Sequence, residues 1–257
     1  MKKPHRPREN WQDRFDSGRY WMFGLHAVRA ALLNPNRKKH KLIVTLNAQN
    51  QLEEAIAASG ITPELCDARK FSAPLDSNSV HQGVALETEG LEWGSPTDVC
   101  KAEEGAVALV LDRVSDPHNV GAILRTAEVF GASAVIAPFR HSAPETGALA
   151  KAASGALERQ PYLRVRNIST EMVALQELGY VMIGLEGEAP LSLGDAMQAA
   201  KGSPIGIVLG AEGPGLREKT RDTCDALAAI PSETSFASLN VSNAAAVALY
   251  ASKSFKG

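Results

Sequence analysis

The fold is decided by residues 206–216, which read GIVLGAEGPGL. A short run of Ile, Val and Leu passes directly into a loop that holds Gly210, Gly213 and Gly215. A continuous apolar run predicts a strand buried on both faces, as in a parallel sheet covered by helices. Glycine backbone adopts positive φ easily and lets a ligand come close. The stretch therefore predicts a ligand-binding loop at the carboxyl edge of a parallel α/β sheet, in preference to a glycine turn without function.

The composition of this loop narrows the class of ligand. Its glycines follow a GxxGxG order, which differs from the GxGxxG of dinucleotide-binding folds, and the Lys-Ser/Thr pair of a P-loop is missing. An ordinary nucleotide-binding oxidoreductase is therefore not indicated. Glu212 would repel a phosphate, but it suits a ligand with a positive centre.

Further apolar runs on both sides of the loop extend the pattern. They cover residues 106–111, 134–137, 163–165, 181–185 and 227–230. Helical stretches are expected between them, at 120–130 and 170–178, and a last helix over 241–254. This alternation predicts one α/β domain over residues 105–257.

A smaller α/β domain is predicted ahead of it, over residues 19–90. Apolar residues recur at helical spacing from Phe23 to Ala31 and stop at Asn34-Pro35-Asn36. Strands are expected at 41–46, 61–65 and 84–87, and a helix at 52–58. Residues 91–104 are interpreted as a linker, and residues 1–18 as a basic flexible arm.

The composition, 44% hydrophobic and 22% charged, is typical of a soluble globular protein. The three cysteines are far apart and odd in number, so neither a disulfide framework nor a zinc site is indicated. A reducing, cytoplasmic location is expected. No run approaches the roughly 18 apolar residues of a membrane span, and no signal peptide is evident.

The net charge of −2 conceals an asymmetry. Residues 1–44 hold eleven Lys or Arg against three acids, a local charge of +8, and the remainder carries −10. Positive charge gathered at one end is compatible with nucleic-acid binding. The basic run at residues 37–41 (Arg37, Lys38, Lys39, His40, Lys41) interrupts a folded segment and predicts a phosphate-contacting patch. For residues 1–18, a solvated leader is an equally good interpretation.

A second motif, DRVSDPHNVGAILR at residues 112–125, follows one of the predicted strands. Asp116 suits a helix N-cap and Pro117 the first helical position. The apolar stripe of the helix consists of Val120, Ile123, Leu124 and Ala127.

Arg125 points away from that stripe, roughly 140° around the helix from Val120. Gly121, one turn earlier, leaves room on the same side. By spacing alone, an ion pair of Arg125 with Glu128 on a solvated face is favoured. Asn119, in the first helical turn, could equally satisfy only backbone groups.

A third motif, IPSETSFASLNVSN, occupies residues 230–243. Ser238 and Asn240 are plausible caps of the last helix. Caps do not explain why so many small polar residues follow Ile230-Pro231. Their hydroxyl and amide groups could position a ribose or an amino-acid group.

Taken in order, the three motifs resemble the SpoU/TrmH family of RNA ribose 2′-O-methyltransferases, within the SPOUT class. The matching segments are DPHNVGAILRTA at 116–127, LGAEGPGL at 209–216 and SLNVS at 238–242. The resemblance covers about residues 105–257. Weaker similarity at 23–28, 81–84 and 150–158 is to the small RNA-binding domain and catalytic domain of the subgroup that modifies guanosine in large-subunit rRNA.

The resemblance implies an α/β fold with a C-terminal trefoil knot, a homodimer, S-adenosylmethionine as cofactor and no metal. Arg125 would be catalytic, acting with an RNA phosphate on the 2′-hydroxyl. Asn119 would fix that arginine or the ribose, and Ser238 and Asn240 would hold the target nucleotide. The residues implied at the cofactor are Leu185, Glu186, Gly187, Gly210, Glu212, Gly215, Ile230 and Leu239.

A free arginine is a very weak base. We therefore favour a role for Arg125 in orienting the phosphate and stabilising the developing alkoxide. Because the 2′-hydroxyl accepts the methyl group, DNA is excluded as a substrate. Two alternatives stay open: the same reaction on tRNA, and a non-catalytic RNA-binding assembly factor. The small domain favours rRNA.

Overall fold

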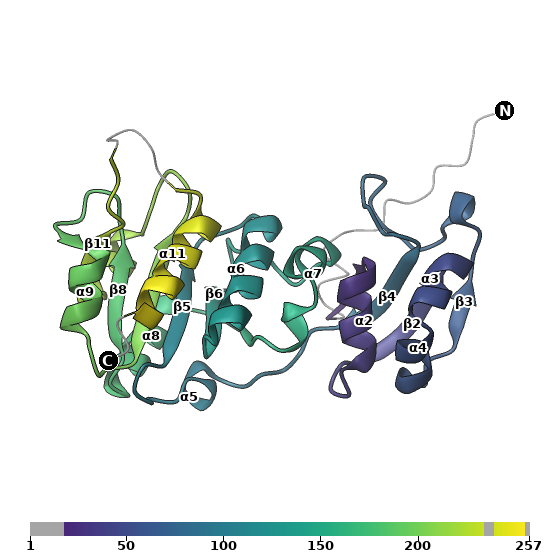
Figure 1. The fold of residues 1–257 in the computed structure, drawn as a ribbon, viewed down its shortest axis with the longest axis horizontal. Helices are drawn as coiled ribbons and strands as arrows, with labels where there is room; N and C mark the ends of the chain where they lie inside the picture. Colours follow the sequence, from purple (N-terminus) through teal and green to yellow (C-terminus); the bar gives the residue numbers. More distant parts are fainter. Residues whose placement is uncertain (1–17, 234–238, 255–257) are drawn as a thin grey trace. The chain divides into compact units, whose positions relative to one another are not determined.

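The protein divides into two compact units, one ending at Leu91 and one starting at Glu92. Its structure is a computed structural model that describes residues 18–233 and 239–254 (Figure 1). Each unit has its own sheet and its own buried core.

The first unit is a four-stranded sheet in the order β1-β4-β2-β3. β1 (Arg19–Phe23) and β2 (Lys39–Val44) are antiparallel to β4 (Val84–Glu89), and β3 (Pro63–Leu65) is parallel to β2. The helical elements of this unit are α2 (Leu25–Leu33), α3 (Leu46–Gln51), α4 (Glu53–Ser59) and the 3-10 turn η1 (Ala68–Lys70).

The predicted helix starting at Phe23 is wrong in its first part. Met22 and Phe23 end strand β1, and the helix begins at Leu25. Gly24 separates them with φ of 91°, a conformation that residues with a side chain rarely adopt. The apolar spacing missed this boundary because Phe23, a buried strand residue, also stands four positions before the buried Ala27 of the helix.

The second unit is a seven-stranded sheet in the order β7-β6-β5-β10-β8-β11-β9, with every neighbouring pair parallel. The strands predicted from apolar runs are confirmed to within one residue at either end. They are β5 (Val107–Asp112), β6 (Ala134–Pro138), β7 (Tyr162–Val165), β8 (Val181–Leu185), β10 (Ile205–Gly210) and β11 (Ala226–Ala229). The two-residue edge strand β9 (Leu191–Ser192) is too short to leave an apolar run.

Helices cover both faces of this sheet, which explains why its strands are apolar on both sides. α6 (Pro117–Phe130) lies beside α11 (Val241–Ser254), and α7 (Gly147–Ala153) and α9 (Leu193–Ala199) pack in the same layer (Figure 1). α8 (Ile168–Glu177), α5 (Pro96–Val99) and α10 (Glu218–Asp222) pack together as a second group. The 3-10 turn η2 (Ala156–Glu158) contacts α6 and α7.

Part of the predicted linker belongs to the core of the second unit. Ser95 begins α5 with a capping box to Asp98, and Cys100 is buried among residues of β5, β6 and α8. Gly94-Ser95-Pro96, a sequence also common in linkers, lies at the start of this helix, because Ser at the N-cap and Pro at the first position favour helix initiation as well as loops.

Candidate active site

The first predicted motif forms the start of α6 as expected. The carboxylate of Asp116 accepts a hydrogen bond from the His118 backbone N–H at 3.0 Å, and Pro117 occupies the first helical turn. The predicted apolar stripe is confirmed, since Val120, Ile123, Leu124 and Ala127 are all buried. The helix ends at Gly131 in the left-handed conformation.

Arg125 is exposed on this helix, on the side away from the stripe. The expected ion pair with Glu128 is wrong, because the carboxylate of Glu128 is bound by the guanidinium of Arg159. Within residues 18–233 and 239–254, the Arg125 guanidinium makes no hydrogen bond or ion pair. It is therefore available to a phosphate.

The room expected beside Gly121 is filled by the protein itself. A Cβ on Gly121 would lie 2.5 Å from the Cβ of Ala152 and 2.8 Å from the carbonyl oxygen of Leu149, both on α7. This glycine permits close packing of α6 against α7, not the approach of a ligand. The sequence could not show this because α7 is distant along the chain and was not predicted.

One hydrogen-bonded cluster joins the three predicted motifs. The side-chain amide of Asn119 donates to Glu212 Oε1 at 3.1 Å, and the amide of Asn240 donates to the same oxygen at 2.7 Å. Asn240 also donates to Asn119 Oδ1 at 3.0 Å. We call these three residues the amide–carboxylate cluster. It connects side chains separated by up to 121 positions in the sequence.

The same cluster begins the last helix. Asn240 Oδ1 accepts hydrogen bonds from the backbone N–H and the hydroxyl of Ser242 at 2.9 and 2.6 Å. The backbone N–H of Val241 lies 3.4 Å from Glu212 Oε1. Asn240 thus has the capping role proposed from the sequence as well as a place in the cluster. Ser238 lies outside the described residues.

The residues predicted at a cofactor follow three neighbouring strands. Leu185, Glu186 and Gly187 come at the end of β8, Gly210 ends β10 and Ile230 follows β11, and these strands are adjacent in the order β10-β8-β11. Carboxyl ends of parallel strands lie at the same sheet edge, so these positions share that edge. Leu239, just before α11, is 49% exposed.

The glycine loop is folded tightly on itself. The Gly215 N–H donates to the Ala211 carbonyl at 2.9 Å, and Gly213 and Gly215 both have positive φ. A Cβ on Gly210 would lie 2.2 Å from the Gly215 carbonyl carbon and 2.5 Å from the Leu216 nitrogen. Glycine at 210 is therefore required for the loop to close.

Two ion pairs that the sequence analysis missed involve arginines that follow this loop. Buried Asp112, at the end of β5, accepts from the Arg217 backbone N–H at 3.0 Å and from Arg217 Nε at 2.7 Å. Glu186 binds Arg221 through both carboxylate oxygens, at 2.8 and 2.6 Å, and this raises the pKa of the Arg221 guanidinium. A carboxylate directly after a buried strand is the signal that could have indicated Asp112.

The two cysteines of the second unit do not supply a thiolate near neutral pH. Burial raises the pKa of Cys224, which precedes β11, to about 12, and burial likewise raises the pKa of Cys100 to about 11. Both thiols are therefore protonated near neutral pH. Across the described part of the chain, no group of three or more His, Cys, Asp or Glu side chains could hold a metal ion.

The first unit brings together two of its own weakly similar segments. Gln82 Oε1 accepts from the Leu25 N–H at 3.1 Å, and the Thr45 N–H donates to the Gly83 carbonyl at 2.8 Å. A cavity of about 590 Å³ is lined by these residues together with Leu46, Asn47, Gln51, Cys66, Asp67, Ala68 and His81. The segments 23–28 and 81–84 therefore form one local structure.

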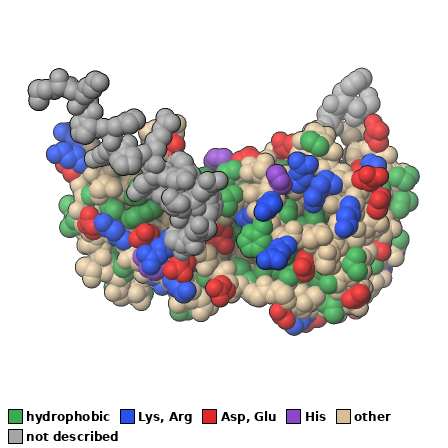
Figure 2. Space-filling view, turned by 180° about the vertical axis from the view of Figure 1, so that it is seen from behind, with side chains coloured by type: hydrophobic (Ala, Val, Ile, Leu, Met, Phe, Trp, Pro, Cys, Tyr) green, Lys and Arg blue, Asp and Glu red, His purple; other side chains and the backbone are tan. Residues whose placement is uncertain are grey.

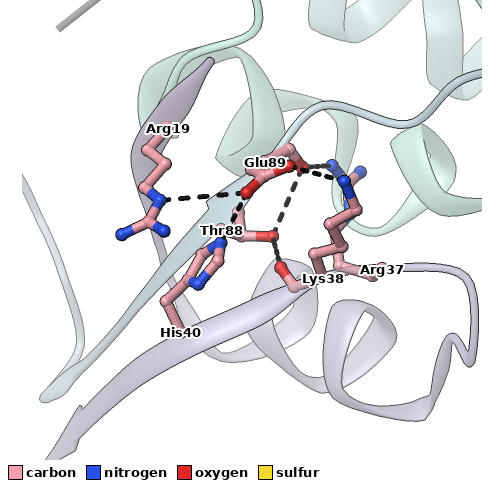
Figure 3. Close-up of polar contacts among 6 residues, drawn as sticks. All are labelled: Arg19, Arg37, Lys38, His40, Thr88 and Glu89. Carbon is pink, nitrogen blue, oxygen red and sulfur yellow. Dashed lines mark hydrogen bonds and ion pairs between the residues drawn. The ribbon is translucent and has the colours of Figure 1, made fainter. Parts of the chain in front are cut away.

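The basic run at residues 37–41 is largely neutralised (Figure 3). Glu89 accepts from Lys38 at 3.0 Å and contacts His40 at 2.8 Å, and these hydrogen bonds hold the pKa of the Glu89 carboxyl below its ordinary value. Lys41 pairs with Glu64 at 2.8 Å. The Arg37 side chain is buried and donates to the Glu89 carbonyl. The expected phosphate contact of Arg37 is thus wrong, because its guanidinium is used to hold β2 against β4.

None of the described helices is both long and apolar enough to cross a membrane.

Two family models match the chain, one to each unit. The model described as "SpoU rRNA Methylase family" matches residues 106–250. The model described as "RNA 2'-O ribose methyltransferase substrate binding" matches residues 21–93.

Similar curated proteins match nearly the whole chain. A 23S rRNA (guanosine-2'-O-)-methyltransferase RlmB from Vibrio parahaemolyticus is 35% identical over 239 residues, which cover 90% of this chain and 94% of that protein. The protein of the same name from Ralstonia nicotianae is 38% identical over 235 residues, covering 89% and 93%.

Solved structures share the fold. The SpoU methyltransferase AviRb from Streptomyces viridochromogenes, in complex with AdoMet, aligns with a TM-score of 0.80 at 21% identity, covering 95% of this chain and 92% of that one. An AdoMet-bound rRNA methyltransferase from Sinorhizobium meliloti aligns with a TM-score of 0.75 at 23% identity, covering 95% and 90%.

Proposed function

Because the chain belongs to the SpoU rRNA methylase family, we propose that it transfers a methyl group from S-adenosylmethionine to the ribose 2′-hydroxyl of a guanosine in 23S rRNA. The observation that carries this proposal is the amide–carboxylate cluster, which joins all three motifs. It includes Asn119 of α6, the helix that also carries the exposed Arg125, whose guanidinium has no partner among the described residues. The second unit matches the model of this family, and the first unit matches a substrate-binding model of RNA 2'-O ribose methyltransferases. The relatives named for this reaction match the chain over nine-tenths of its length.

The residues at the sheet edge fit S-adenosylmethionine. Space beside the Gly187 α-carbon is open, since a Cβ there would meet no atom of the described residues within 4 Å. Leu185, Ile230 and the half-exposed Leu239 offer apolar contacts to an adenine ring. The carboxylates of Glu186 and Glu212 at this edge suit a ligand that carries a sulfonium cation. Backbone of Gly210, Gly215, Ile230 and Leu239 would hold the cofactor.

The reaction requires a poor nucleophile to lose a proton and meet the methyl group in line. When bound, S-adenosylmethionine supplies a methyl group that moves from sulfur to oxygen, and 2′-O-methylribose, S-adenosylhomocysteine and a proton result. Arg125 holds an RNA phosphate beside the 2′-hydroxyl and stabilises the developing alkoxide. Asn119 and Asn240, fixed by Glu212, orient the ribose relative to that arginine.

The proposal is tested by methyl transfer from labelled S-adenosylmethionine to purified rRNA and tRNA from cells that lack the enzyme. We expect label in 23S rRNA only, in an alkali-resistant dinucleotide with a 2′-O-methylguanosine. Label in tRNA would show that tRNA, the alternative substrate, is methylated instead. Absence of transfer to both RNAs, with RNA binding intact, would favour the non-catalytic assembly factor.

Glu212→Ala is expected to lower kcat/KM by on the order of 10²-fold, because Asn119 and Asn240 lose their shared acceptor and the three motifs are no longer held together. Glu212→Gln retains an acceptor oxygen and should recover part of the activity. Steady-state methylation of rRNA measures both variants. Equal activity of Glu212→Ala and the wild-type protein would contradict the role of the cluster.

A homodimer is also part of the proposal. α6 and α11 pack side by side and expose apolar side chains, Val129 at 75%, Val247 at 40% and Tyr250 at 65%. The Tyr250 ring lies against Phe130 in an edge-to-face contact with centroids 6.4 Å apart. A second copy packed on this face would cover it and bring its own residues near Arg125, which lies on the same helix α6.

Tyr250→Asp combined with Val129→Asp is expected to convert the protein to a monomer, because two carboxylates would be buried in an apolar contact. Sedimentation velocity at micromolar concentration measures the change. The matched control is Val173→Asp, at an apolar residue 46% exposed on α8. Loss of the dimer in the control, or its persistence in the double variant, would place the interface elsewhere.

Two further expectations belong to the proposal. The predicted C-terminal trefoil knot is supported by the position of β11 between β8 and β9 and by the packing of α11 on α9, β10 and α6. A cytoplasmic location is supported by the bacterial relatives named as acting on 23S rRNA.

A further inference from the structure

A cavity of about 850 Å³ lies in the second unit, next to the residues that follow the glycine loop. Its charged and titratable lining consists of Arg140, His141, Arg166, Arg217 and Lys219, and no carboxylate is among the described residues that line it. Figure 2 shows Lys and Arg side chains gathered on this unit. In a chain with a net charge of −2, a cavity that carries only positive charge indicates an anionic ligand.

Most cations of this cavity have no carboxylate partner among the described residues. Arg140, Arg166 and Lys219 are exposed, and none of them forms an ion pair within residues 18–233 and 239–254. Only Arg217 is engaged, through its pair with Asp112. This differs from the basic run of the first unit, where Glu89 and Glu64 bind the Lys and His side chains.

An exposed aromatic ring stands at the same cavity. Phe139 is 61% exposed although it directly follows the buried strand β6. The guanidinium of Arg164 lies 5.5 Å from the Phe139 ring centroid and 5.7 Å from that of buried Tyr162. One side of the phenyl ring thus meets a fixed guanidinium, while more than half of the side chain remains open to solvent.

The loop that carries Phe139 is bound by the Arg164 side chain. Arg164 donates to the carbonyl oxygens of Pro138, Phe139 and Ala143 at 3.2, 2.6 and 2.9 Å. His141 adopts a positive φ of 62°, a strained conformation for a residue with a side chain. These three hydrogen bonds from Arg164 preorganise the exposed Phe139 ring and the cations beside it.

The cavity opens at the same sheet edge as the cofactor loops. Phe139 follows β6, Arg166 follows β7 and Arg217 follows the glycine loop after β10, all at carboxyl ends of parallel strands. β6 and β10 are separated only by β5, a distance of about 10 Å at the usual strand spacing.

We propose that this cavity binds a single-stranded segment of the substrate RNA next to the methylated nucleotide, with one base stacked on Phe139 and its phosphates held by Arg140, Arg166 and Lys219. An exposed aromatic ring among unpaired cations is the chemistry that recognises single-stranded nucleic acid, whose bases are free to stack. The inference rests on the proposed function for the identity of the RNA, but not for the binding itself.

The test uses the full chain and a fluorescein-labelled uridine decamer, with binding followed by anisotropy from 50 to 200 mM salt. We expect Arg166→Glu with Lys219→Glu to weaken binding at least about tenfold. The slope of log affinity against log salt should fall by about 1.4, the value for two phosphate contacts on a single strand. Lys101→Glu with Lys201→Glu is the matched control, because both lysines are exposed and precede strands, at the opposite edge of the sheet. A loss as large in the control would overturn the proposal.

The stacking contact has its own test. Phe139→Ala should weaken decamer binding about tenfold, Phe139→Trp should restore it, and Phe139→Leu should not. The affinity for a blunt RNA duplex of ten base pairs should stay unchanged in all three variants. Wild-type affinity in Phe139→Leu, or an equal loss on the duplex, would overturn the single-strand assignment.

These results are independent of the proposed reaction. Decamer binding needs no methyl transfer. If the protein fails to methylate rRNA, but the cavity variants still bind the decamer more weakly than the control variants, the proposed function is refuted and the RNA-binding role of the cavity is supported. If rRNA is methylated, the cavity variants should raise the KM for rRNA with kcat retained. A loss of kcat alone would overturn the binding role.

Discussion

Arg125→Ala is expected to lower the rate of methyl transfer by at least about 10²–10³-fold, with S-adenosylmethionine affinity unchanged. The reason is geometric: Arg125 is exposed on α6, has no partner within the described residues, and lies on the helix whose first turn contributes Asn119 to the amide–carboxylate cluster. Single-turnover methylation of rRNA measures the rate, and calorimetry measures cofactor affinity.

One further variant separates the charge of Arg125 from its shape, and a second is a control at the surface of the same helix. Arg125→Lys keeps the charge but loses the planar fork that binds a phosphate through two hydrogen bonds, so it should recover only a small part of the rate. Arg159→Ala removes the guanidinium bound to Glu128 on the same helix and should retain activity, because exposed ion pairs contribute little to stability. Activity of Arg125→Ala within tenfold of wild type would exclude Arg125 from the chemistry.

Gly210→Ala should abolish measurable binding of S-adenosylmethionine. The added Cβ would lie 2.2 to 2.5 Å from backbone atoms of Gly215 and Leu216, which cannot rotate away as a side chain could. The loop must open to accept the methyl group of alanine, and the backbone groups proposed to hold the cofactor move with it. The rise of the thermal unfolding midpoint on adding cofactor measures this directly, since a ligand stabilises only the state that binds it.

Gly202→Ala is the matched control for the effect of a new side chain. Gly202 has φ of 87° and no atom of the described residues near its added Cβ, so alanine there introduces backbone strain without a clash. It should lower the midpoint by a few degrees, corresponding to roughly 1 kcal/mol, and keep the shift caused by the cofactor. If Gly210→Ala shows the same cofactor shift as Gly202→Ala, the glycine loop does not bind S-adenosylmethionine.

The strands of the second unit were predictable because burial on both faces leaves apolar runs that need no tertiary information. The start of α6 was predictable for a similar reason, since Asp116 and Pro117 act within one helical turn. The strand β1 and the position of Gly121 depend on what packs against them, and a local pattern cannot show that.

The candidate site, too, was predictable only in part. The resemblance to the family indicated Asn119, Arg125, Glu212 and Asn240 as site residues, but not that Glu212 would accept hydrogen bonds from both asparagines. The pairs Asp112–Arg217 and Glu186–Arg221 connect residues 105 and 35 positions apart, and no spacing rule indicates such pairs. Arg37 was misassigned because a basic run looks the same whether its side chains face solvent or a neighbouring strand.

The strand order has a consequence for how the protein is made on the ribosome. β10 pairs with β5 on one side and β8 on the other, and β11 lies between β8 and β9. During synthesis, β5 therefore has one unpaired edge until β10 has been made. β8 has unpaired edges until both β10 and β11 have been made. Unpaired apolar strands associate readily with one another and with other chains. Nascent chains that stop before β10 should thus depend on chaperones, whereas chains extended past β11 should not.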